Sequence, residues 1–155
     1  MSPRIHVFVY GTLKPEERNY HICASDVIDI QPAIATGRVY HLPAFNYPAM
    51  TVEEYGTVAG YRLSFTNSTI LATLDEFEQH DPNQFRQMTP HLALEAYQYT
   101  RQKVSLQTPQ RSPLASAWAY VMTLQQIHHL NGQPIPSGCW NGLAENPDKK
   151  SSSIS

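Results

Sequence analysis

The stretch VFVYGTLKPEERN, residues 7–19, begins as an apolar run and breaks at Gly11. The run from Arg4 to Tyr10 is rich in β-branched and aromatic residues, which predicts a central strand buried on both faces. A glycine and a threonine then stand where this strand leaves the core. Two interpretations are open: an ordinary turn, or a cradle of backbone N–H groups that binds an anion.

Length and charge limit what the chain can be. Its 155 residues suit one domain with a core of ordinary size. Eleven basic and thirteen acidic side chains leave a formal net charge of −2, which argues against binding to nucleic acid or to a membrane surface. The first apolar run is too short for a signal peptide or a spanning helix, so we expect a cytoplasmic location. Cys23 and Cys139 form no CxxC pair, and we expect both to be reduced and free of metal.

Strand patterns alternate with loops along most of the chain. A proline followed by two acids predicts a short helix from Glu16 to about Ala24. The remaining segments predict, in order, a strand at 33–42 entered through Gly37, a loop at 43–50, a strand at 57–65 with a bulge at Gly60, a strand at 85–94, a polar irregular or hairpin insert at 95–112, and a last strand at 115–123. Together with two short helices, these strands predict an α+β fold, a single domain whose small mixed sheet curls into a barrel.

One carboxylate stands out in the helix predicted over residues 67–79. The apolar residues of this segment share one face: Ile70, Leu71, Leu74 and Phe77. Glu78 falls within this apolar stripe, whereas Asp75 and Glu76 fall on the other side. Burial of Glu78 would be costly unless it is paired, and would raise its pKa towards neutrality, as suits a general acid or base. The alternatives are that Glu78 reaches water at a frayed helix end, or pairs with Arg86.

Three motifs together resemble the γ-glutamylcyclotransferase-like (AIG2-like) family. VFVYGTLKPEERN is similar to the family's strand followed by Tyr-Gly-Ser/Thr-Leu. LDEFE, residues 74–78, is similar to Leu-Asp-x-x-Glu, whose last residue is the family's catalytic glutamate. AWAYV, residues 117–121, is a weaker match to a late strand with an embedded tyrosine. The resemblance covers residues 5–141 and implies a γ-glutamylcyclotransferase-like domain over 1–145. The composition of NPDKKSSSIS, residues 146–155, separately predicts a disordered tail.

The resemblance also implies a reaction and a site. The α-amine of a γ-glutamyl compound would attack its own γ-amide carbonyl, which releases 5-oxoproline and an amine or amino acid, as a transferase or lyase does. Glu78 would be the catalytic residue that moves the proton, and no metal or cofactor would be needed. The substrate would bind to one set of residues: Tyr10, Gly11, Thr12, Leu13 and Tyr120. The expected partner is therefore a small γ-glutamyl substrate.

The chain departs from the family pattern at several positions. Gln79 stands where a glycine usually follows the catalytic glutamate, and Phe85 stands where many members have a tyrosine. Gly60-Tyr61 replaces a Gly-Glu pair in the third strand, and the polar insert has no clear counterpart. These departures bear first on substrate identity and then on activity. The alternative interpretation is a non-catalytic module of the same fold that binds a small carboxylate.

Other chemistries find less support in the sequence. Glu76, Glu78, His80 and Asp81 are close in sequence, but the two glutamates point to opposite sides of a helix and no HExxH motif is present. There is no GxSxG motif and no Walker loop, which argues against a serine hydrolase or a nucleoside triphosphatase. Four aromatic residues are candidates for a pocket wall or for ordinary packing: Phe45, Tyr47, Tyr97 and Tyr99.

Overall fold

The structure, a computed structural model, describes residues 4–15, 17, 19–43, 47–78 and 99–140, with the side chains of 76–78 excepted. The strands are β1 (Ile5–Val9), β2 (Asp29–Thr36), β3 (Arg38–Leu42), β4 (Tyr47–Thr51), β5 (Thr57–Phe65), β6 (Thr100–Gln107), β7 (Pro113–Val121) and β8 (Gln133–Pro134). The helices are the 3₁₀ turns η1 (Tyr20–Ile22) and η2 (Ala24–Asp26) and the α-helices α1 (Thr69–Glu78) and α3 (Leu124–His129). The strand predicted at 85–94 and the tail predicted at 146–155 lie outside these residues.

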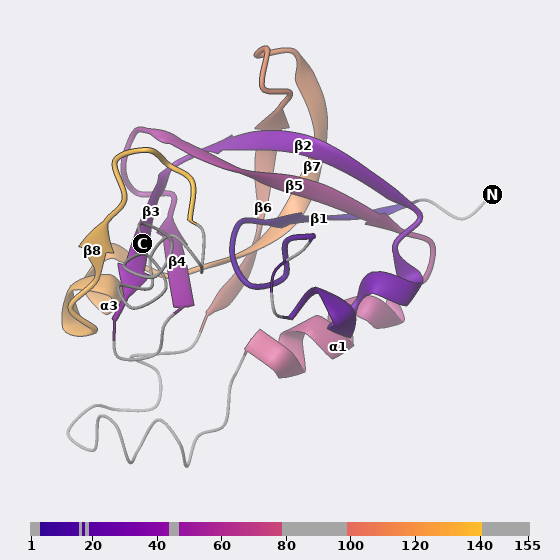
Figure 1. The fold of residues 1–155 in the computed structure, drawn as a ribbon, viewed down its shortest axis with the longest axis horizontal. Coiled ribbons are helices and arrows are strands. Elements are labelled where there is room, and N and C mark those ends of the chain that lie inside the picture. The colour runs from indigo at the N-terminus through magenta and orange to yellow at the C-terminus, as the bar shows by residue number, and fades with distance from the viewer. Residues whose placement is uncertain (1–3, 16, 18, 44–46, 79–98, 141–155) are drawn as a thin grey trace, which may run out of the picture.

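Five strands close into a small barrel, in the order β1-β5-β2-β6-β7. The barrel closes where β7 pairs in parallel with β1, at Val7 and Trp118. At its end β7 also pairs with β4, at Met50 and Val121, so that β4, β3 and β8 extend the sheet beyond the barrel. Figure 1 shows α1 and the 3₁₀ turns on one side of the barrel and α3 with the β3–β4–β8 extension on the other. The predicted α+β fold with a barrel is confirmed.

The first strand is buried on both faces, as predicted. Val7 and Val9 pack with the residues beneath α1, whereas Phe8 and Tyr10 point into the barrel. This alternation follows from the two-residue period of a strand. Because the barrel is narrow, the large ring of Phe8 is accommodated among small side chains of the neighbouring strands: Ala33, Ala35, Ala117 and Ala119.

The helix predicted from its apolar stripe is present as α1. The side chain of Asn67 accepts a hydrogen bond from Thr69 N–H (3.0 Å), which satisfies one of the free donors at the helix start. Ile70 and Leu74 are buried against the barrel wall formed by β1 and β5. The packing of these two residues fixes which face of α1 meets the barrel.

The predicted helix over 16–24 is wrong for the residues that the structure describes there. The chain forms successive i→i+3 turns instead, as in Cys23 N–H to Tyr20 O (3.1 Å). One further bond, from Asn19 N–H to Thr12 O (2.9 Å), ties this segment back to the loop after β1. That long-range bond holds the segment against the loop, and short tight turns meet this constraint where a regular helix would not.

The region predicted as one strand at 33–42 contains two. β2 starts earlier, at Asp29, and the chain turns at Gly37, where φ is +150° and a side chain would crowd Thr51 O. β3 follows and pairs with β4, so the loop predicted at 43–50 ends where β4 begins, at Tyr47. The bulge predicted at Gly60 is also wrong, because the pairing of β2 with β5 runs through Gly60 without a shift.

The described part of the polar segment, residues 99–112, belongs to a hairpin arm of the barrel, the second of the two forms predicted for it. Within it β6 pairs with β7 along most of its length and with β2 at Ile34 and Ala35. Only Val104 and Leu106 of β6 are buried, and the other positions face away from the core. The polar composition therefore reflects a strand with one solvated face.

After β7 the chain forms structure that the sequence analysis missed. Thr123 caps α3 in a reciprocal box with Gln126 (3.1 and 2.8 Å). The segment at 135–140 has no helix or strand, but it is tied to β3 and β5 by hydrogen bonds from Ile135 N–H to Val39 O and from Ala59 N–H to Gly138 O, and it buries Trp140 completely. Trp140 Nε1–H donates to His41 Nδ1 (3.0 Å). Of the described helices, none combines the length and apolar character needed to span a membrane.

The two cysteines should differ sharply in reactivity. Cys23 has no exposed surface, and burial raises the pKa of its thiol to about 11. Cys139 is exposed. Because the thiolate is the reactive form, we expect a thiol reagent at pH 8 to modify one cysteine in the native protein and both after denaturation. Two thiols modified at equal rates in the native state would contradict this burial.

Candidate active site

A pocket of about 420 Å³, including the space open to solvent at its mouth, lies at one end of the barrel. It is bordered by residues from the end of β1 and its loop, from β4, from the start of β6 and from the end of β7: Phe8, Val9, Tyr10, Gly11, Thr12, Leu13, Tyr47, Pro48, Tyr99 and Tyr120. All five residues predicted to bind substrate border it. Their role in binding remains a prediction, but the fold brings them together although Tyr120 is far away in sequence.

The topology explains why these segments meet. β1 and β7 are parallel neighbours, so their carboxyl ends, at Val9 and Val121, lie at the same edge of the barrel. The loop that follows β1 turns tightly, with Lys14 N–H donating to Gly11 O (3.0 Å). Within the described residues, the N–H groups of Gly11, Thr12 and Leu13 donate to no backbone carbonyl. That pattern is what an anion cradle requires, and the cradle itself stays a prediction.

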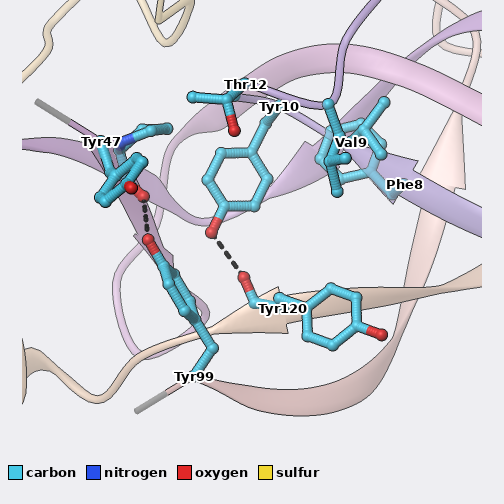
Figure 2. A pocket seen from close by; sticks show the side chains of 10 residues that line it. Phe8, Val9, Tyr10, Thr12, Tyr47, Tyr99 and Tyr120 are labelled. Carbon is cyan, nitrogen blue, oxygen red and sulfur yellow. Dashed lines mark hydrogen bonds between the residues drawn. The ribbon is translucent and has the colours of Figure 1, made fainter. Parts of the chain in front are cut away.

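The Tyr10 hydroxyl holds three strands together at the pocket. It accepts a hydrogen bond from Met50 N–H in β4 (3.1 Å) and donates to Tyr120 O in β7 (2.5 Å). Figure 2 shows the Tyr10 ring beside Thr12, with its hydroxyl pointing at the Tyr120 carbonyl. The ring is thus held in place as a wall of the pocket, and its hydroxyl stabilises the packing of β4 and β7 around it.

Two further tyrosines complete the described wall. Tyr99, just before β6, donates its hydroxyl to Pro48 O in β4 (2.6 Å). Figure 2 shows Tyr99 and Tyr47 on the side of the pocket opposite Phe8 and Val9. Both tyrosines were candidates for a pocket wall, whereas Phe45 and Tyr97 lie outside the described residues.

Glu78, the predicted catalytic residue, is the last residue of α1. Its side chain lies outside the described part of the structure, so its predicted position beside the loop of residues 11–13 stays a prediction. The buried residue Leu74 precedes it by one turn of the helix and packs with Leu13 of the pocket loop in one cluster. The helix that carries Glu78 and the loop that borders the pocket therefore share one hydrophobic cluster.

The helical periodicity predicts that Asp75 lies free on the polar face of α1, but its side chain is paired. Its carboxylate accepts a hydrogen bond from the Tyr120 hydroxyl (2.7 Å) and pairs with Arg101 in β6 (3.0 Å). Figure 2 shows the Tyr120 ring turned away from Tyr10, so that only the backbone of Tyr120 faces the Tyr10 hydroxyl. The sequence did not predict this role of Asp75, and the one feature that singles the residue out is its place in the LDEFE motif.

A buried lysine lies directly after the pocket loop. The Lys14 side chain is 7% exposed, and its ammonium donates to Trp140 O. In the described part of the chain it forms no ion pair.

The described pocket lining carries no charged side chain. A carboxylate ligand would therefore meet backbone N–H groups rather than an arginine or lysine on the wall. In the same part of the chain, no three histidine, cysteine, aspartate or glutamate side chains gather as they would around a metal ion. The described lining is thus uncharged and partly aromatic, and the binding of a carboxylate there stays a prediction.

We expect Gly11→Ala to damage the pocket directly. A Cβ at this position would collide with the ring of Pro48, which also borders the pocket. Overpacking of this kind costs about 1–3 kcal/mol of stability. Urea unfolding measures this loss, and the affinity for a pocket ligand should fall with it. Unchanged stability and affinity would show that the loop and Pro48 separate easily.

Comparisons with known proteins bear on the family and the fold of the chain. The family described as γ-glutamyl cyclotransferase, AIG2-like, matches residues 7–142. Similar solved structures include an AIG2-like protein from Mus musculus, 17% identical, with a TM-score of 0.65 over 94% of this chain and 92% of that one. A protein from Arabidopsis thaliana is 20% identical, with a TM-score of 0.60 over 99% of this chain and 78% of that one.

YkqA from Bacillus subtilis is 22% identical, with a TM-score of 0.63. The alignment covers 97% of this chain but only 43% of YkqA, so this chain spans less than half of that relative. No curated protein matches the chain in sequence. At these identities the solved structures establish the fold alone, and the family match covers most of the chain. The chain belongs to the γ-glutamyl cyclotransferase, AIG2-like, family.

Proposed function

We propose that the protein is a γ-glutamyl cyclotransferase that converts a γ-glutamyl compound into 5-oxoproline and a free amine or amino acid. The observation that supports this most is the pocket wall made by Gly11, Thr12 and Leu13, whose N–H groups make no backbone bond within the described residues. A wall of this kind suits the α-carboxylate of a glutamyl group. Membership of the family supplies the reaction class.

The reaction needs one proton carrier and a folded substrate. The α-ammonium of the substrate is not a nucleophile, so a base must first take its proton. The amine nitrogen then forms a bond to the γ-carbonyl carbon and loses a second proton to solvent. The amide C–N bond breaks, and the leaving nitrogen receives the proton that the base carries. We assign this transfer to the Glu78 carboxylate. Because the attack is intramolecular, a pocket that holds the glutamyl chain curled supplies much of the acceleration.

The test is the release of 5-oxoproline from a panel of γ-glutamyl compounds. The panel should contain γ-glutamyl amino acids, glutathione, γ-glutamyl-ε-lysine and simple γ-glutamyl amines, because the pocket dimensions do not decide the leaving group. We expect turnover of at least one class without added metal. Binding of γ-glutamyl compounds without any turnover would instead support a non-catalytic carboxylate-binding module. A cytoplasmic location remains a prediction from the sequence.

A further inference from the structure

One cluster of polar side chains joins α1 to the barrel next to the pocket. Asp75 Oδ1 accepts the Tyr120 hydroxyl proton (2.7 Å), and Asp75 Oδ2 lies 3.0 Å from Arg101 Nη1. The three residues come from α1, β7 and β6. Asp75 and Arg101 are only partly exposed, with 37% and 31% of their side chains accessible. A single carboxylate therefore bridges two neighbouring strands and the helix.

The position of this bridge along α1 matters. The buried apolar contacts described for the helix come from Ile70 and Leu74, in its first and second turns. Asp75 follows directly, and Glu78 ends the helix three residues later. The last four carbonyl groups of a helix have no hydrogen-bond donor within the helix, so its last turn tends to fray. The contacts of Asp75 with β6 and β7 thus lie within one helical turn of Glu78.

Tyr120 connects this bridge with the pocket. Its backbone carbonyl accepts the hydrogen bond from Tyr10 at the pocket wall, and its hydroxyl donates to Asp75. Any shift of β7 relative to α1 would therefore disturb both contacts. Arg101 is held in turn over the ring of Trp118, 5.1 Å from its centroid. The partners of Asp75 are thus themselves fixed by strand and ring contacts.

We propose that Asp75 is a positioning residue, which fixes the C-terminal turn of α1 through Tyr120 and Arg101 and so sets where Glu78 meets the substrate. The inference rests on the proposed function, because it takes Glu78 as the proton carrier. General acid–base catalysis depends on placement of the carboxylate within hydrogen-bond reach of the reacting nitrogen. The bridge supplies a rigid strand-based support for that placement.

The experiment measures the stability of the helix end and the rate of the reaction separately, in the variants Asp75→Ala and Asp75→Asn. Amide hydrogen exchange over residues 74–78 should be faster in Asp75→Ala than in the wild type. On a substrate that the wild type turns over, kcat should fall about tenfold or more, as for a misplaced catalytic group, with KM little changed. Asp75→Asn should recover part of the rate, because its amide oxygen can still accept from Tyr120.

The pH profile of kcat separates positioning from a mere loss of folded protein. A misplaced Glu78 has altered surroundings, so the acidic limb of the profile should shift in Asp75→Ala. The matched control is Asp29→Asn, which removes another partly exposed aspartate paired with an arginine, Arg62 (3.8 Å), on β2 and β5. We expect this control to keep both the exchange rates of residues 74–78 and the turnover.

The outcomes distinguish the two proposals. Unchanged exchange in Asp75→Ala would overturn the bridge as a support of the helix end. Faster exchange with full turnover and an unchanged pH profile would overturn its positioning role. A wild type without turnover on any γ-glutamyl compound would overturn the proposed function, and with it the purpose assigned to the bridge, whereas the exchange experiment would still decide whether Asp75 holds α1.

Discussion

We expect Glu78→Gln to lower the rate of 5-oxoproline release by about a hundredfold or more, the usual scale for losing a general base. Glutamine keeps the shape of the side chain but carries no exchangeable carboxyl proton. The variant should therefore stay folded, with an unchanged unfolding midpoint, and should still bind the γ-glutamyl compound. The measurements are single-turnover and steady-state rates on a substrate that the wild type turns over, together with a binding titration.

The matched control is Glu76→Gln, which makes the same chemical change two residues earlier in α1. Helical geometry rotates this position by about 200° from Glu78, so the periodicity of the sequence assigns it to the polar face. We expect its rate to stay within about twofold of the wild type, as for most surface substitutions. Equal rates for Glu78→Gln and the wild type would remove Glu78 from the mechanism and most of the proposed function with it.

The parts of the fold that the sequence predicted are those with a local signal. β1 and β5 are rich in β-branched and aromatic residues, and the stripe of α1 repeats at helical spacing, so each shows its type within a short window. The predicted first and last residues of these three elements agree with the structure to within about two residues, a typical margin for such patterns. The barrel was predicted from the combination of several short strands with two short helices.

The strands that the analysis missed depend on distant partners. β4 contains Pro48, which usually marks a loop or a strand edge. Here Pro48 precedes Met50, the residue at which β4 pairs with β7, and it faces His41 of β3. β6 shows only two buried side chains, and its pairing with β2 joins segments about seventy residues apart. No local window contains this information.

The residues of the candidate site also fall into those with a local sequence signal and those that depend on distant partners. The residues of the YGTL loop were predicted because glycine and threonine stand directly after a strong strand. Asp75 was missed because helical periodicity assigns a face to a residue but does not identify what packs against that face. Its partners Arg101 and Tyr120 lie 26 and 45 residues away and reach it only because β6 and β7 are adjacent. Long-range strand pairing thus decides which polar residues support a site.

Trp140→Ala should cost about 3–5 kcal/mol of unfolding free energy, the range for removing a fully buried large aromatic ring. The indole has no exposed surface and packs inside the barrel with Phe8 and Val58. It also stacks on His41, with ring centroids 6.4 Å apart, and donates to its Nδ1. A domain of this size has about 5–15 kcal/mol of stability in total, so the loss would be a large share of it.

The measurement is urea unfolding, with the midpoint and the slope compared between variants. The matched control is Trp118→Ala, since Trp118 lies half-exposed on the outside of the barrel beneath Arg101 and Lys103. We expect the control to lose about 1–2 kcal/mol, because only partial burial and cation–π contacts are removed. An equal loss in both variants would contradict the assignment of Trp140 to the barrel core.

Trp140→Ala should also weaken ligand binding, although its ring does not border the pocket. The backbone carbonyl of Trp140 accepts the hydrogen bond from Lys14, the residue that follows the YGTL loop. Without the indole, the segment at 137–140 keeps its bond from Ala59 N–H to Gly138 O but loses its side-chain anchor, so the residue-140 carbonyl is no longer held in place for the Lys14 ammonium. A buried charge left without a partner is costly, so the loop should move to let Lys14 reach water. Binding of a γ-glutamyl compound should therefore weaken in conditions where Trp140→Ala is still folded, whereas Trp118→Ala should bind as the wild type does.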